Sequence, residues 1–183
     1  MLRWRGRFFW GISAGPLSVN SLSSTTEPLS RGDSPNPVDP NPEVRAAKLS
    51  AVLSTREAKR VRALFQDCCE RGVYYASGAG YKALCVILGL VDVYVFTEDS
   101  TYKWDSCGPH AILRSLDGDM ADLKECLKRK QAGRPKERPE LLYNTPVAEA
   151  SGTEKWANRG GLIAYRSKAD LEAVLQLLTT IEL

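Results

Sequence analysis

A small-residue turn at Gly78-Ala79-Gly80 has the composition of an anion-binding site. It opens an apolar stretch, Ala79–Leu88, that predicts a buried helix stopping at Gly89. Free N–H groups and the positive end of the helix dipole attract phosphate at such a start, and Lys82 adds a positive charge beside them. Gly-x-Gly is also typical of an ordinary turn, so this spacing alone leaves both interpretations open.

Asp105 is the second residue whose type and position suit a chemical role. It lies where a loop is expected to give way to a helix, and a carboxylate there can either cap the helix or hold a hard cation such as Mg²⁺. Glu98 and Asp99 follow a predicted strand, Val91–Phe96, and are the nearest other acidic candidates. We expect His110, further along the helix, to be a structural side chain.

Ser54, Thr55 and Arg56 form a third candidate group. They follow a predicted strand, Lys48–Leu53, and Ser54 with Glu57 fits a capping box for the next helix. The point where the carboxyl end of a strand meets a helix start is a favoured ligand position in α/β proteins. A plain helix cap and a solvated arginine are the alternative interpretation.

The residues around Asp105 resemble a phosphatase signature. Trp104-Asp105 followed by Ile112 is similar to Trp-Asp-x-x-Ala-x-x-x-Ile of the Mg²⁺-dependent, lithium-sensitive phosphatases of the inositol monophosphatase superfamily. Further strings resemble the inositol polyphosphate 1-phosphatase family within it, roughly from Arg3 to Leu178 but not in the Ser/Pro-rich stretch near Ser23 to Pro42. These strings are Gly-Ala-Gly-Tyr-Lys, Val-Asp-Val-Tyr-Val-Phe, Lys-Trp-Asp-Ser-Cys, His-Ala-Ile-Leu-Arg and Trp-Ala-Asn-Arg-Gly-Gly-Leu-Ile-Ala-Tyr-Arg-Ser.

The resemblance implies a fold and a set of site residues. The fold is an α/β layered sandwich of the lithium-sensitive phosphatase type, of which this chain is the second half. Asp105 is then a Mg²⁺ ligand, although Gly108 replaces the signature alanine, Pro109 follows it, and Asp117-Gly118-Asp119 replaces a glycine-rich turn. The implied substrate contacts are Ser54, Thr55, Arg56, Gly78, Ala79 and Lys82.

The resemblance also implies an activity. It is Mg²⁺-dependent removal of the 1-phosphate from inositol 1,4-bisphosphate and inositol 1,3,4-trisphosphate by a monomeric enzyme. The upstream glutamate and the Asp-Pro-Ile/Leu-Asp-Ser/Thr motif of the family do not occur in the chain, so we expect no catalytic residue here and little activity alone. The alternatives are a non-catalytic isoform that binds anions or a partner, and a relative of 3'(2'),5'-bisphosphate nucleotidases.

Composition narrows the class of protein. The 183 residues, 43% of them apolar, are enough for one domain. A net charge of +3 does not predict a nucleic-acid partner, and no apolar run approaches the ~20 residues of a membrane span. Five cysteines without Cys-x-x-Cys spacing and a single histidine indicate reduced thiols in a cytoplasmic protein rather than a zinc site.

Three segments are expected along the chain. Residues 1–17 contain a β-prone stretch, Arg7–Ser13, that would be an orphan strand of the family domain, and residues 18–43 form a flexible Ser/Pro-rich loop. Residues 44–183 form the α/β subdomain. The arginine- and serine-rich start also resembles a mitochondrial transit peptide, which is the alternative to an internal segment of the family domain.

The other elements follow from apolar periodicity and turn signals. A buried helical stripe at Val61, Leu64, Phe65 and Cys68 is predicted. The remaining expectations are a small strand at Leu141–Tyr143, a basic solvated loop at Lys128–Pro139, a buried strand at Leu162–Tyr165 and a last helix capped by Ser167.

Overall fold

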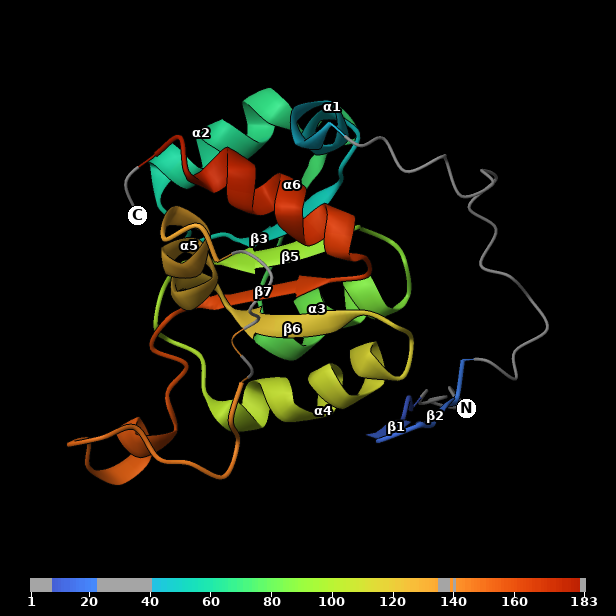
Figure 1. Ribbon diagram of the computed structural model, residues 1–183, viewed down its shortest axis with the longest axis vertical. Coiled ribbons are helices and arrows are strands. Elements are labelled where there is room, and N and C mark those ends of the chain that lie inside the picture. The colour runs from blue at the N-terminus through green and yellow to red at the C-terminus, as the bar shows by residue number, and fades with distance from the viewer. Residues whose placement is uncertain (1–7, 23–40, 135–138, 140, 182–183) are drawn as a thin grey trace, which may run out of the picture.

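The central sheet of the computed structural model contains five strands (Figure 1). The structure describes residues 8–22, 41–134, 139 and 141–181. The strands of the sheet are β3 (Ala51–Ser54), β4 (Val73–Ala76), β5 (Val93–Phe96), β6 (Asp119–Asp122) and β7 (Leu162–Tyr165). Their order across the sheet is β4-β3-β5-β7-β6, with β3, β4 and β5 parallel and β7 antiparallel to both its neighbours.

The parallel strands determine where a ligand site can form. Helix α2 (Lys59–Cys68) connects β3 to β4, and helix α3 (Ala79–Ile87) connects β4 to β5. Because parallel strands are joined by crossovers, the carboxyl ends of β3, β4 and β5 meet at one edge of the sheet. The turns that begin at Ser54, Ser77 and Thr97 therefore lie along the same edge.

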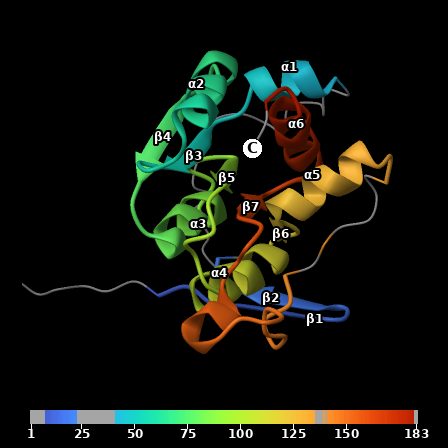
Figure 2. The ribbon, with the colours of Figure 1, turned by 90° about the vertical axis from the view of Figure 1, so that its left-hand side faces the viewer.

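Helices cover both faces of the sheet, as the α/β layered expectation requires (Figures 1 and 2). Helices α1 (Pro42–Ala47), α2, α5 (Leu123–Gln131) and α6 (Lys168–Leu178) cover one face. Helices α3 and α4 (Lys103–Arg114) cover the other. Leu53 packs into the first layer and Val52 into the second, because alternate side chains of a strand point to opposite faces.

Several expected elements are confirmed. In α2, Val61 and Phe65 are fully buried, and Leu64 and Cys68 pack against the same core. The Leu162–Tyr165 strand is β7. Ser167 caps α6 by accepting a hydrogen bond from the Asp170 backbone N–H, 3.2 Å away.

The expected strand at Leu141–Tyr143 is wrong. Between α5 and β7, the described residues form a 3₁₀ helix, η1 (Gly152–Trp156), and otherwise irregular chain. Side chains rather than a strand ladder hold this stretch in place, since Tyr143 hydrogen-bonds to His110 of α4. The Lys128–Pro139 segment begins inside α5, and residues 135–138 lie outside the described part.

The β-prone stretch before residue 18 contains a strand whose partner lies further along the chain. The strand is β1 (Gly11–Ala14), and it pairs antiparallel with β2 (Leu17–Asn20) in a two-stranded hairpin. A turn at Gly15, with φ of 56°, joins them. The segment assigned to a flexible loop therefore begins with a strand, and its residues 23–40 lie outside the described part.

The hairpin presents its polar face to the rest of the protein. Ser18 Oγ and Asn20 Nδ2 donate hydrogen bonds to the Ser115 carbonyl at the end of α4, at 3.0 and 2.9 Å. On the opposite face Ile12 is paired with Val19, and both are more than 40% exposed. Within the described residues, this apolar face is open to solvent.

The helices of the described part are also short. None of them is long and apolar enough to cross a lipid bilayer.

Candidate anion-binding and metal site

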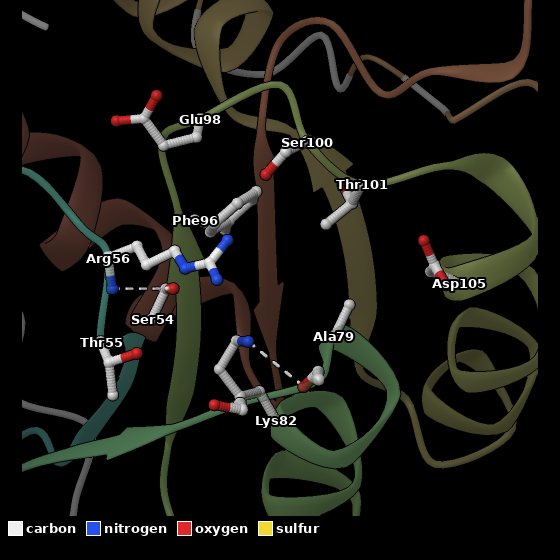
Figure 3. Close-up of a pocket in the computed structure, with 12 residues that line it drawn as sticks. Ser54, Thr55, Arg56, Ala79, Lys82, Phe96, Glu98, Ser100, Thr101 and Asp105 are labelled. Atoms are coloured by element: carbon white, nitrogen blue, oxygen red, sulfur yellow. Dashed lines mark hydrogen bonds between the residues drawn. The ribbon is translucent and has the colours of Figure 1, made fainter. Parts of the chain in front are cut away.

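A cavity of about 350 Å³ lies at the carboxyl edge of the parallel strands (Figure 3). It is bounded by the turns after β3, β4 and β5 and by the start of α4. All seven site residues expected from the sequence line it. Its lining is Ser54, Thr55, Arg56, Ser77, Gly78, Ala79, Lys82, Phe96, Glu98, Ser100, Thr101 and Asp105.

The start of α3 points its free N–H groups toward this cavity. Gly78 precedes the first helical residue, Ala79, and has φ of 83°, a conformation that glycine adopts without strain. No side chain caps the helix start, so an anion in the cavity would meet unshielded backbone donors.

Lys82 contributes the positive charge of this wall. Its side chain is buried, with Nζ donating to the Gly78 carbonyl at 3.2 Å and lying 5.0 Å from the centroid of the Tyr94 ring. Burial lowers the pKa of Lys82, while the nearby Glu57 carboxylate opposes that shift. An anion in the cavity would favour the charged amine and would supply a partner for its remaining donors.

Arg56 adds a second cation from the opposite wall. It follows β3, and its side chain extends across the mouth of the cavity above Lys82 (Figure 3). Its guanidinium is exposed, and its backbone N–H donates to Ser54 Oγ at 3.2 Å. One arginine guanidinium can donate to two phosphate oxygens at once. Arg56 and Lys82 together therefore suit a phosphate group.

Asp105 both caps α4 and faces the cavity. It is the third residue of the helix, and its Oδ2 accepts a hydrogen bond from the Tyr102 backbone N–H at 2.9 Å. The carboxylate also lines the cavity opposite Lys82, so the two alternatives left open by the sequence are compatible. A carboxylate has further lone pairs after one such bond, and these can bind a cation.

The other acidic candidates divide between two roles. Glu98 lines the cavity, whereas Asp99 lies 3.5 Å from the Arg159 guanidinium outside it. Among the described residues no group of three or more His, Cys, Asp and Glu side chains is placed to hold a metal ion.

The predicted Ser54–Glu57 capping box is wrong. Ser54 is the last residue of β3, and α2 begins four residues beyond the predicted start, after Ala58. Glu57 is instead only 2% exposed, and its carboxylate accepts hydrogen bonds from the backbone N–H and the hydroxyl of Thr97. Burial raises the pKa of Glu57, although its hydrogen bonds to Thr97 oppose this.

Side chains from the stretch around η1 hold the first turn of α4. Tyr102 OH donates to Glu154 at 2.9 Å, and Asn158 Nδ2 donates to Ser106 Oγ at 3.3 Å. These contacts place the turn that carries Asp105. Sequence reasoning missed them because they join residues about fifty positions apart.

His110 is structural, as expected from its place on α4. It is 4% exposed, and its two ring nitrogens lie 2.7 Å from Tyr143 OH and 2.6 Å from Asp119 Oδ1. Burial raises the pKa of Tyr143, which keeps its hydroxyl protonated. The His110 imidazole therefore connects α4, β6 and the stretch before η1.

The fold and the cavity define a class of protein. It is an α/β protein with cations and helix N–H groups at the carboxyl edge of parallel strands, facing a carboxylate across one cavity. The sequence matches the inositol monophosphatase family over residues 2–171, and the chain belongs to that family.

Individual relatives give the same assignment. The chain is 45% identical over 177 residues to inositol polyphosphate 1-phosphatase of Mus musculus, and 45% identical over 181 residues to that of Homo sapiens. Each match includes 97% of this chain but 44% of the relative, so the chain spans less than half the length of these proteins. A 3'(2'),5'-bisphosphate nucleotidase 1 of Dictyostelium discoideum is 32% identical over 66% of the chain and 34% of that relative.

Proposed function

We propose that this chain forms the substrate-binding part of a Mg²⁺-dependent phosphomonoesterase that removes the 1-phosphate from inositol 1,4-bisphosphate and inositol 1,3,4-trisphosphate. The observation that carries the proposal is the single cavity shared by Arg56, Lys82, the start of α3 and Asp105. The likeness to inositol polyphosphate 1-phosphatases supports the choice of substrate over a nucleoside bisphosphate, since the nucleotidase match is less similar and shorter.

Each group in the cavity has a role in this proposal. The N–H groups at Ala79 and the amine of Lys82 bind one phosphate, and the Arg56 guanidinium binds a second phosphate or a ring oxygen. The hydroxyls of Ser54 and Thr55 hydrogen-bond to ring hydroxyls. Two anchors of this kind orient the inositol ring and select a substrate with more than one phosphate.

The donor chemistry of the cavity fits Mg²⁺. This ion is usually held by one or two carboxylates together with waters and substrate phosphate, and Asp105 and Glu98 are carboxylates at the same cavity. Asp105 would hold the ion through Oδ1, the carboxylate oxygen that does not accept from the Tyr102 N–H. The chemistry that a bound Mg²⁺ supplies in phosphatases is activation of water and stabilisation of charge on the leaving oxygen.

We infer that the chain alone turns over slowly. The acidic motif that positions the attacking water in the resembled family does not occur in its sequence, and the described residues hold no cluster of three metal-binding side chains. A phosphate-release assay with inositol 1,4-bisphosphate and Mg²⁺ should give a rate far below that of the human full-length relative. A comparable rate from this chain would contradict the argument.

Binding can be tested separately from turnover. Isothermal titration with inositol 1,4-bisphosphate should show binding by the wild type, and Lys82→Met should weaken it by about tenfold, the effect of losing one charged hydrogen bond. The matched control is Lys124→Met, an exposed lysine of α5 outside the cavity. Equal affinities of wild type and Lys82→Met would exclude the cavity as the phosphate site.

A second candidate is a non-catalytic protein that binds anions or a partner. The incomplete set of metal-binding side chains favours it. In that case titration would show weak binding that does not change when Mg²⁺ is removed, and no phosphate would be released. We propose the cytoplasm as the compartment in either case, since all five cysteines are free thiols.

A further inference from the structure

Strands β3 and β5 both end at the cavity, but they are paired only in their first halves. The β3–β5 ladder pairs Ala51 with Val93 and Val52 with Tyr94, and no pair follows these two. Ser54 and Phe96, at the ends of the strands, are therefore not joined by the ladder. Another contact must hold the turn after β3 against the turn after β5.

Glu57 supplies that contact. It lies in the turn after β3, directly after Arg56, while Thr97 is the first residue after β5. One carboxylate oxygen of Glu57 accepts from both the Thr97 backbone N–H, at 3.3 Å, and the Thr97 hydroxyl. Thr97 is itself 9% exposed, so both partners are shielded from water.

The burial of the Glu57 carboxylate is energetically costly and needs a structural explanation. Burying an acidic side chain is unfavourable unless hydrogen bonds or a nearby cation compensate, and a solvated glutamate would avoid the penalty. The two Thr97 donors offset part of this cost, although burial still leaves the pKa of Glu57 raised.

We propose that Glu57 is a positioning residue that fixes the spacing between the Ser54–Arg56 turn and the turn that begins at Thr97. This role rests on the proposed function, since the spacing matters for a ligand site formed by Arg56 after β3 and by Glu98 and Asp105 after β5. From Thr97 the chain runs through Glu98 to α4, so the contact also fixes the loop that leads to Asp105. Ordering these turns before the ligand arrives improves affinity because less motion is lost on binding.

The test compares Glu57→Ala with Glu57→Gln. The amide oxygen of glutamine can still accept from Thr97, whereas alanine removes the acceptor. Amide hydrogen exchange measured by NMR reports on the Thr97 N–H directly, and titration with inositol 1,4-bisphosphate reports on affinity. Glu70→Gln, an exposed glutamate just past α2, is the matched control.

We expect Glu57→Ala to speed exchange of the Thr97 amide and to raise the Kd about tenfold, as loss of a buried hydrogen bond predicts. Glu57→Gln should keep both values within about threefold of the wild type, because the acceptor remains. If Glu57→Ala does not fold, Thr97→Val, which removes only the hydroxyl donor, should still raise the Kd. All titrations are made well below the unfolding temperature of each variant.

The outcomes separate the two proposals. A wild-type chain that does not bind inositol 1,4-bisphosphate overturns the proposed function and the positioning role together. A wild type that binds, with alanine and valine variants of unchanged Kd or with unchanged Thr97 exchange in Glu57→Ala, overturns the positioning role alone. Equal loss of affinity in Glu57→Ala and Glu57→Gln overturns it as well, because charge rather than the hydrogen bond would then be responsible.

Discussion

Asp105 illustrates how one side chain serves both the fold and the site. Its bond to the Tyr102 N–H stabilises the first turn of α4, where a negative charge also interacts favourably with the helix dipole. That same hydrogen bond restricts rotation of the Asp105 carboxylate, so the carboxylate faces the cavity in one orientation. A ligand role for Asp105 therefore depends on the helix start rather than on the residue alone.

The His110–Asp119 pair gives a residue-scale prediction about stability. Asp119→Ala leaves the buried His110 Nε2 without its partner, so we expect a loss of roughly 1–3 kcal/mol in the free energy of unfolding at pH 7. Asp67→Ala, an exposed change on α2, should lie within about 0.5 kcal/mol of the wild type. Urea unfolding monitored by circular dichroism measures both.

The pH dependence of this loss follows from the carboxyl group. Burial of Asp119 acts to raise its pKa, but the hydrogen bonds from His110 and the Met120 backbone N–H, together with the charges of His110 and Arg114, outweigh it, so the net pKa lies below the usual 3.8. A lowered pKa means that the stabilisation is present above pH 3.8 and is lost as pH falls through the folded-state value. The difference between wild type and Asp119→Ala should therefore shrink in strong acid, and a constant difference would contradict the assignment.

Helix α4 is the element on which the site depends most. It carries Asp105 at its start, packs against α3 and contacts the β1–β2 hairpin at its end. Pro109 lies in its interior, and proline has no N–H to donate to the Asp105 carbonyl one turn earlier. The helix continues through Pro109 because packing and the contacts from the η1 region compensate.

Replacing Pro109 tests how much stability the protein loses by having a proline inside α4. Pro109→Ala restores a donor to the helix and should raise the free energy of unfolding by about 2 kcal/mol, after allowance for the greater freedom of the unfolded chain. Differential scanning calorimetry would show a higher Tm. An unchanged or lower Tm would mean that the proline ring packs well enough to offset the missing hydrogen bond.

At the scale of the whole molecule, the β1–β2 hairpin is a poorly covered part of the described structure. Isolated two-stranded sheets are marginally stable, and this one contacts α4 mainly through small and polar residues. Its outward face carries large apolar side chains, and solvent-exposed apolar side chains are rarely clustered on monomeric globular proteins. These exposed side chains are Trp10, Ile12, Leu17 and Val19.

The exposure of this face can be measured with a hydrophobic dye. The double variant Ile12→Thr and Val19→Thr keeps β-branched side chains but removes apolar surface, so it should reduce the fluorescence of bound ANS by roughly half. Leu90→Thr, an exposed leucine away from the hairpin, is the control. Unchanged fluorescence in the double variant would show that something covers the hairpin in solution.

Local features of the sequence predicted most of the helices and strands. The apolar periodicity of α2, the strand at Leu162–Tyr165 and the Ser167 cap are all confirmed, because each depends on neighbours within a few residues. The capping box at Ser54 and the strand at Leu141–Tyr143 are wrong for the complementary reason. There, Glu57 and Tyr143 bond to Thr97 and His110, and such distant partners override local preference.

The sequence by itself determined which chemical groups the protein offers: a glycine turn before a helix, Lys82, Arg56 and Asp105, together with a family likeness. Only the tertiary structure decided that these groups share one cavity, since parallel strand order brings the ends of β3, β4 and β5 to the same edge. It also decided that Glu57 is buried beneath them and that the hairpin turns its apolar face outward. Both outcomes depend on which distant residues come into contact, and residue spacing along the chain does not carry that information.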